Sequence, residues 1–352
     1  MLDGVDQTIF QTYTVLDLTD YQSYDKALDV YYLTVAYLST MRNWDNITAF
    51  DVSRFLIYYR LVGVLLFETF ENRTLLLIFP NTFEYFFIFY EAVRLRWNPV
   101  RMSKQTVIGA AAFIWIVIKL PQEYWIHVAQ RDVTDTLRAN PVLYPILGVV
   151  IVALVVCAWW LMKYRLPPAD RRPSFAVDAA PVRRAARALG ATRTLRQMLD
   201  ATVGEKIALI ALVVVIFSQI VPGTNATTLQ LTIGVAFVIV SNTLISELLA
   251  RRGVGEWTTV FRQFVGMAAI NIGAAFAAWR ILPTGDRELH LGNTLFFLLL
   301  ITLMITLYDR FHPYYLDRID AASAAARHDP AAGAPGAPGT PAFSAPTNPP
   351  RR

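Results

Sequence analysis

The chain has 352 residues, of which 55% are hydrophobic and 13% aromatic, and its mean hydropathy is +0.39. That length could hold two soluble domains, but the composition is typical of a protein that crosses a membrane several times. The net charge of +5 is explained by Lys and Arg in loops on one side of a membrane, so we expect no nucleic-acid partner. The single cysteine, Cys157, excludes an internal disulfide and a cysteine-based metal site.

Residues 1–50 are predicted to form a cytoplasmic N-terminal segment with one interfacial helix. The first basic residue is Lys26, and several Asp residues precede it, which is the reverse of a secretory signal peptide. The apolar stretch 27–41 is about fifteen residues long, too short for a comfortable membrane span, so we expect it to lie at the interface. If it spans instead, the N-terminus moves to the outside.

Residues 51–97 predict two membrane-crossing helices joined by a short turn, and these helices carry charges. Arg60 and Glu84 each lie about nine or ten residues from the same surface, which places both near the bilayer midplane. A charge there costs roughly 2.5 to 3.5 kcal/mol, so we predict an Arg60–Glu84 ion pair. Arg54, Glu68 and Glu91 are secondary intramembrane charges.

A helix kink is predicted at Pro80 and Asn81, because proline lacks the N–H that a continuing helix needs. One hypothesis makes this kink a gate or binding position, with Glu84 as a proton- or cation-responsive group that Arg60 balances. The alternative is a structural kink packed against neighbouring helices, since proline is common in membrane helices.

The rest of the first membrane half, residues 51–164, contains spans at about 106–120 and 142–164. Between them, aromatic and charged residues alternate, which indicates a segment resting at the membrane surface. Lys119, Glu123, His127 and Asp132 form an outer-face polar cluster there, the one group of residues suited to acid–base work or ion binding. A solvated interfacial loop is the alternative interpretation.

Residues 165–204 are predicted to be a basic cytoplasmic linker. A helix in this linker would lie on anionic lipid head groups through its arginines. A merely solvated helix is the alternative. The arginines are Arg183, Arg184, Arg187, Arg193 and Arg196.

The second membrane half, residues 205–309, has four further predicted spans, at about 205–221, 227–249, 262–282 and 291–307. Residues 310–352 form an Ala/Pro-rich tail that we expect to be disordered. Because the most basic loops fall on one side, both termini are predicted to be cytoplasmic. The Ala, Arg and Pro bias of linker and tail suggests a high-GC bacterial genome, so we expect a multi-pass protein of the bacterial cytoplasmic (inner) membrane.

An internal repeat is indicated by the similar segments IGAAAFIW (108–115) and IGAAFAAW (272–279), in the third and seventh spans. Their equal orientation predicts a parallel four-plus-four duplication. Close packing of small residues is the alternative explanation.

The sequence thus predicts an all-α fold, a polytopic membrane helical bundle of about eight transmembrane helices, with a candidate parallel 4+4 repeat. No catalytic motif is recognisable, and we expect neither a cofactor nor a metal. A transporter or permease is the preferred function because of the intramembrane charges and the proline-broken helix. The alternatives are a structural or assembly subunit of a membrane complex and a membrane enzyme acting at the outer leaflet. A protein partner or self-association stays open.

Overall fold

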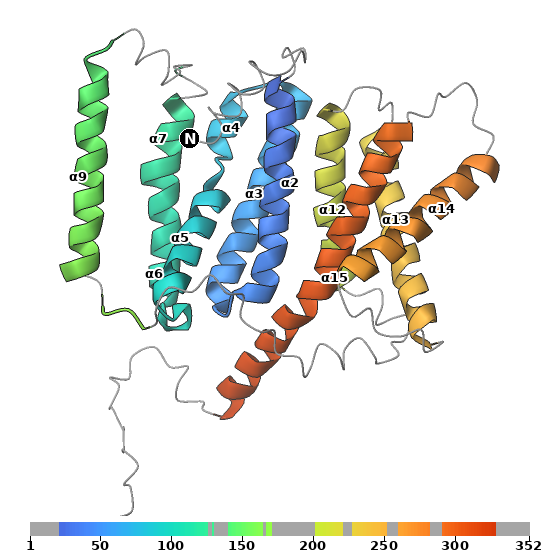
Figure 1. Cartoon of the computed structure of the whole chain (residues 1–352). Coiled ribbons are helices and arrows are strands. Elements are labelled where there is room, and N and C mark those ends of the chain that lie inside the picture. Colours follow the sequence, from blue (N-terminus) through green and yellow to red (C-terminus); the bar gives the residue numbers. More distant parts are fainter. Residues whose placement is uncertain are drawn as a thin grey trace, which may run out of the picture.

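The computed structural model describes residues 21–125, 129, 140–164, 167–170, 201–220, 227–251, 260–281 and 291–328 (Figure 1). Every regular element in these residues is helical, so the all-α prediction is confirmed for this part of the chain. The elements are α2 (Tyr21–Asn43), α3 (Ile47–Phe70), α4 (Thr74–Ile78), α5 (Thr82–Arg96), η2 (Pro99–Arg101), α6 (Lys104–Phe113), η3 (Ile114–Lys119), α7 (Leu120–Glu123), α9 (Leu143–Tyr164), α12 (Ala201–Ile220), α13 (Thr228–Arg251), α14 (Val260–Ile281) and α15 (Leu291–His328).

In the described residues, each segment predicted to span a membrane coincides with one helix or with two or three consecutive helices. By length and apolar composition, one described helical stretch is long and apolar enough to cross a membrane, Lys104–Glu123 with 20 residues. Shorter apolar stretches occur at Leu143–Cys157, Thr228–Thr243 and Phe264–Gly273.

The helices pass back and forth, so the chain alternates between the two ends of one bundle (Figure 1). The C-terminal ends of α2, α5, α9 and α13 lie at the end drawn at the bottom. We call this the lower end, and the opposite one the upper end. α15 is the longest helix and continues past the others at the lower end.

The N-terminal helix α2 differs from the interfacial helix predicted for residues 27–41. It is 23 residues long and packs against α3, α12 and α15 inside the bundle. Its buried side chains include Val30, Leu33, Tyr37 and Met41. The helix begins at Tyr21, so polar residues that precede the apolar stretch add to its length. We therefore correct the prediction: α2 is a member of the bundle.

The lower end of α2 is held by Arg318 from α15. The Arg318 guanidinium donates to the carbonyls of Met41 (2.9 Å), Arg42 and Trp44, and lies 3.5 Å from the Asp45 carboxylate. The last carbonyls of a helix have no partner within the helix, and a cation at that end also complements the helix dipole. This contact joins the first and last helices of the described chain.

The helix α9 stands apart from the bundle at one edge (Figure 1). Residues that follow it are attached to the turn between α5 and α6. There, Asp170 accepts hydrogen bonds from the Asn98 amide and the Arg101 side chain, both at 2.8 Å. Most large apolar side chains of α9 are exposed, among them Val149, Val152, Val155 and Trp159.

The two predicted four-helix groups resemble each other only in part in how their helices pack. The first two helices of each group pack on each other, α3 on α5 and α12 on α13. The third helices differ, because α6 packs on α3 and α5 whereas α14 packs on α15. The second helices differ as well, because α13 is continuous where α4 and α5 are separate. The 4+4 repeat therefore stays a prediction from the sequence.

Candidate functional site

The predicted kink at Pro80 is a complete interruption of the helix. α4 ends at Ile78, and α5 begins only at Thr82. Between them, Phe79 leaves the helical region with φ −110° and ψ 64°. Since Pro80 has no N–H, the carbonyls of the preceding turn lose their usual helical partners.

Two successive residues of α3 bind the carbonyls that the interruption frees. The Tyr59 hydroxyl donates to the carbonyl of Ile78 at 2.9 Å, and Arg60 Nη1 donates to the carbonyl of Phe79 at 3.1 Å. Backbone carbonyls without a partner are costly both in a protein interior and in lipid, so these contacts allow the chain to stay non-helical here. Arg60 is thus positioned by the break.

The break lies close to α3 because Gly63 has no side chain. A Cβ built at Gly63 would meet Cβ of Phe79 at 2.1 Å and its Cγ at 2.6 Å. Atoms joined directly to a backbone have little freedom to move, so residue 63 has to be glycine for this approach.

The N-terminus of α5 is capped by polar groups. The Asn81 side chain accepts a hydrogen bond from the Glu84 amide at 3.4 Å and donates one to Glu84 Oε2 at 2.9 Å. The backbone N–H of Asn81 donates to Glu123 Oε1 at 3.5 Å. The positive end of the α5 dipole therefore meets two carboxylates of the same chain.

Lys119 and Glu123 reach this site from the helical stretch formed by α6, η3 and α7. Lys119 Nζ lies 3.5 Å from Glu123 Oε1, 3.2 Å from Gln122 Oε1 and 4.3 Å from the centroid of the Tyr85 ring. Only 4% of Lys119 and 5% of Glu123 is exposed. These two residues of the predicted outer-face polar cluster are therefore buried in the bundle, and the alternative of a solvated interfacial loop is wrong for them.

The physical reason lies in η3, which is a π-helical segment. A π-helical turn contains more residues than an α-helical turn, so side chains after it are rotated from the positions of a regular α-helix. Lys119 ends this segment, and Glu123 follows one turn later. The other two members of the predicted cluster, His127 and Asp132, lie outside the described residues.

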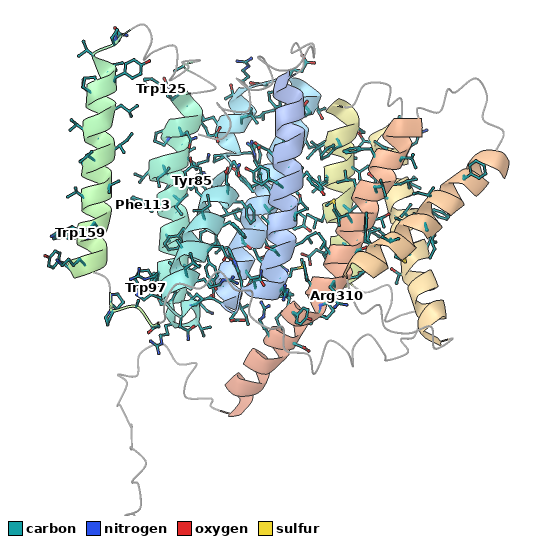
Figure 2. The ribbon with its side chains drawn as sticks, in the orientation of Figure 1. Tyr85, Trp97, Phe113, Trp125, Trp159 and Arg310 are labelled. Carbon is teal, nitrogen blue, oxygen red and sulfur yellow. The ribbon has the colours of Figure 1, made fainter. Side chains whose placement is uncertain are left out.

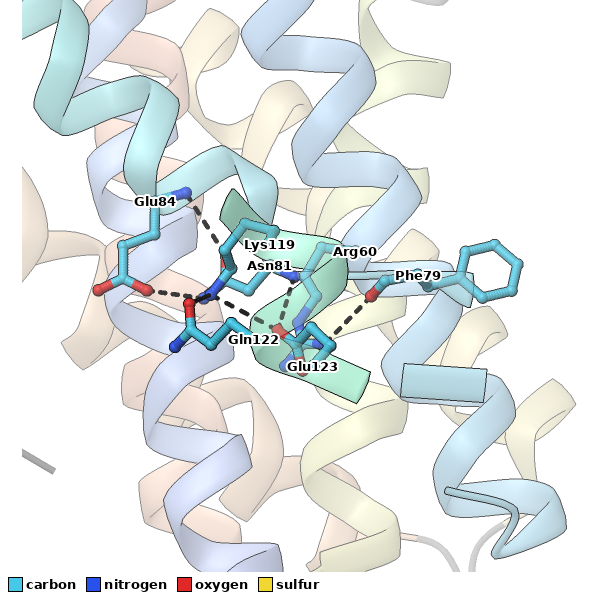
Figure 3. A network of polar contacts seen from close by, with 7 residues as sticks. All are labelled: Arg60, Phe79, Asn81, Glu84, Lys119, Gln122 and Glu123. Atoms are coloured by element: carbon cyan, nitrogen blue, oxygen red, sulfur yellow. Dashed lines mark hydrogen bonds and ion pairs between the residues drawn. The ribbon is translucent and has the colours of Figure 1, made fainter. Parts of the chain in front are cut away.

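The four charged side chains of the site are Arg60, Glu84, Lys119 and Glu123 (Figure 3). The predicted Arg60–Glu84 ion pair is not formed, because Arg60 binds the Phe79 carbonyl and Glu84 binds Asn81. Lys119 instead interacts electrostatically with the other three charged groups. With all four ionised, the net charge is zero. We call this group the charged quartet.

The Arg60 guanidinium has a hydrogen-bond donor that no residue of the quartet accepts. The residue is 6% exposed, and its buried Nε has no hydrogen-bond partner among the described residues. Desolvating such a donor is costly, so it identifies a place where another acceptor could bind.

The secondary charges form separate contacts. Arg54 lies 3.6 Å from Asp51 and 3.8 Å from Glu205 of α12. Glu91 accepts from Trp44 Nε1 at 2.8 Å and pairs with Arg94 at 3.1 Å. A third charge, Glu68, is half-buried near the upper end of α3.

Sequence reasoning missed the ion pair that joins α12 and α15. Lys206 Nζ lies 2.7 Å from Asp309 Oδ1, and the Lys206 side chain is buried. Both residues stand at the borders of predicted spans, where a charge is usually explained by contact with water. For that reason the sequence did not predict that these two residues pair.

No group of residues with the composition of a metal site occurs within the described part of the chain. The linker arginines predicted to bind lipid head groups (183–196) lie outside it. The prediction of a disordered tail over residues 310–352 is wrong for residues 310–328, which continue the helix α15. The tail beyond residue 328 lies outside the described residues. Comparisons of the chain with protein-family models, with curated proteins and with solved structures find no match.

Proposed function

We propose that the chain is a multi-pass membrane protein of the transporter or permease class. The membrane assignment is supported by the exposed apolar surface of the described helices. Figure 2 shows Phe113 between Trp125 near the upper end and Trp97 near the lower end, an order typical of a lipid-facing surface between two interfaces. Further exposed apolar side chains are Phe55, Ile88, Ile108, Ile116, Val117 and Val152.

The proposed orientation places the lower end in the cytoplasm of a bacterial cell. The lower end carries the basic residues Arg94, Arg96, Arg101 and Lys163, and basic loops face the cytoplasm. Because α2 begins at the upper end, we propose that the chain enters α2 from the outside, in place of two cytoplasmic termini. The absence of Lys and Arg from residues 1–20 agrees with this topology.

Labelling with a membrane-impermeant maleimide tests the topology. In a Cys157→Ala background, Asn72→Cys is expected to react on intact cells, because residue 72 lies in the turn between α3 and α4. Lys104→Cys, at the start of α6, is expected to react only after permeabilisation. Equal reactivity of the two positions on intact cells would rule out this arrangement.

The transport function is supported above all by one observation: a broken helix meets the charged quartet, of which Arg60, Lys119 and Glu123 are buried in the bundle. Transporters build their sites from such discontinuous helices, whose free ends and unwound backbone bind ions or charged solutes. Charges at this depth are expensive for stability and are retained where ions or solutes pass. We propose that Glu123, with Lys119 as its partner, is the proton-responsive group, in place of Glu84.

Proton flux into reconstituted vesicles tests this function. After an external acid step in a medium of sodium, potassium, chloride and acetate, and after subtraction of the rate in empty vesicles, vesicles with wild-type protein are expected to acidify at least about tenfold faster than vesicles with Glu123→Gln. Lys104→Gln removes an exposed cation far from the quartet and is expected to match wild type. Equal rates in all three preparations and in empty vesicles would refute proton-coupled transport.

A structural or assembly role is the second candidate function. It is favoured because the charges of the quartet neutralise one another and because the carbonyls of Ile78 and Phe79 have hydrogen-bond partners within the chain. A protein that flux measurements find inactive, but that the quartet stabilises, would have this role. The enzyme alternative has less support, because Lys119 and Glu123 are buried in the bundle and not exposed to a substrate at the membrane surface.

A further inference from the structure

The N-terminus of α5 is occupied by an anion that belongs to the chain itself. The Glu123 carboxylate accepts from the Asn81 amide at 3.5 Å and lies 3.5 Å from Lys119 Nζ. α5 has 15 residues, so its dipole adds to the positive potential at this end. A backbone N–H and a cation are the usual partners of a carboxylate group in a binding site.

A second, independent feature points to a ligand. Arg60 is more than nine-tenths buried, and its Nε has no acceptor among the described residues. In Figure 3 its side chain lies with Lys119, Asn81 and Glu123 beside the break. A guanidinium has five donors in a planar fork that fits a carboxylate. The site thus offers more donors than its own side chains use.

We propose that this site binds a small monovalent carboxylate solute, which replaces the Glu123 carboxylate at the α5 N-terminus while Glu123 takes up one proton. The proposal rests on the transport function above and names its substrate class. The proton goes to Glu123, whose neutral side chain then leaves the Asn81 amide and Lys119. The solute carboxylate takes over these partners together with the free Nε of Arg60.

The charge balance favours this exchange over the binding of an anion alone. The ionised quartet is neutral, so an added anion would leave a buried net charge, which is costly. Protonation of Glu123 makes the quartet +1, and one monovalent anion restores neutrality. A cation would instead meet Arg60 and Lys119, two like charges at close range.

Within the described residues, the charged and titratable groups around the Lys119–Glu123 pair come from three elements. Lys119 lies on the same helical stretch as Glu123, Glu84 and Tyr85 lie on α5, and Arg60 lies on α3. The remaining neighbour, α4, packs on α7 and has the sequence TLLLI, which carries no titratable side chain. Lys119 opposes protonation of Glu123, and Glu84 favours it.

Calorimetry of acetate binding to the full chain in detergent tests the proposal. Acetate is expected to bind more tightly at about pH 5 than at about pH 8, by at most tenfold per pH unit for one linked proton. Repeating the titration in buffers of different ionisation enthalpy is expected to reveal about one proton taken up per acetate. Binding without proton uptake, or no binding at either pH, would overturn the proposal.

Three variants and one competing ion sharpen the test. Glu123→Gln resembles the protonated side chain and is expected to bind acetate equally at both pH values, without proton uptake. Arg60→Gln is expected to weaken binding at least about tenfold, and the exposed control Lys104→Gln to leave it unchanged. If Glu123→Gln does not fold, the proton uptake of the wild type still decides. Equal binding of chloride would overturn the carboxylate assignment.

The same preparations separate the two proposals. Proton flux without acetate binding would refute the carboxylate site and leave proton-coupled transport in place. Proton-linked acetate binding without flux would refute transport and leave the binding site in place.

Discussion

Gly63→Ala is expected to destabilise the protein by about 1 to 3 kcal/mol or more, although it adds only one methyl group. The added Cβ would meet Cβ of Phe79 at 2.1 Å, and a Cβ cannot turn aside because it is fixed to the backbone. The unwound segment would have to move away from α3. That movement would separate Tyr59 and Arg60 from the carbonyls that they bind.

The matched control is Gly109→Ala in the neighbouring helix α6. A Cβ at Gly109 has no atom within 4 Å, and alanine favours a helix over glycine by about 1 kcal/mol. Thermal or SDS-induced unfolding of the detergent-purified variants measures both effects. If the two substitutions have the same effect, α3 and the break do not approach each other as described.

Lys119→Met is expected to cost about 3 to 5 kcal/mol, because it leaves the Glu123 carboxylate buried without its cation. The two charged groups lie 3.5 Å apart, and each side chain is more than nine-tenths buried. Methionine fills much of the volume of lysine, so the loss reports on charge more than on packing.

The double variant Lys119→Met/Glu123→Gln is expected to recover most of this stability, since no unpaired charge then remains. Arg101→Gln is the comparison at the surface: its ion pair with Asp170 is shorter, 2.8 Å, but the Arg101 side chain is 72% exposed. We expect a change of only about 0 to 1 kcal/mol there. A double variant as unstable as Lys119→Met would mean that the pair contributes through packing.

The helical fold could be predicted because apolar stretches of helix length repeat along the chain, and turn residues separate them. The same rule failed for α2, whose apolar stretch is shorter than the helix. What brings α2 into the bundle is its packing on α15, with Arg318 binding carbonyls near its end. Local hydropathy cannot predict a contact between residues that are so distant in the sequence.

The candidate site was predicted in its location but not in its pairing. Arg60, Pro80 and Glu84 were found because a charge or a proline is unusual in an apolar helix. Their partners depend on the exact rotation of each helix. The π-helical segment η3 changes that rotation for Lys119 and Glu123. Its sequence, IWIVIK, contains no residue pattern that predicts a π-helix. The role of Gly63 depends on the distance between α3 and Phe79 in the break, which only the folded chain defines.

The contact between α2 and α15 also sets an order of events during synthesis. Trp44 and Arg318 are separated by 274 residues, a gap that a ribosome covers in roughly 14 to 55 s at 5 to 20 residues per second. Throughout that time α2 lacks the helix that covers one of its sides. The first helix of the described chain to be made is therefore among the last to be completed. A chain that stops early would be recognisable as defective near its beginning.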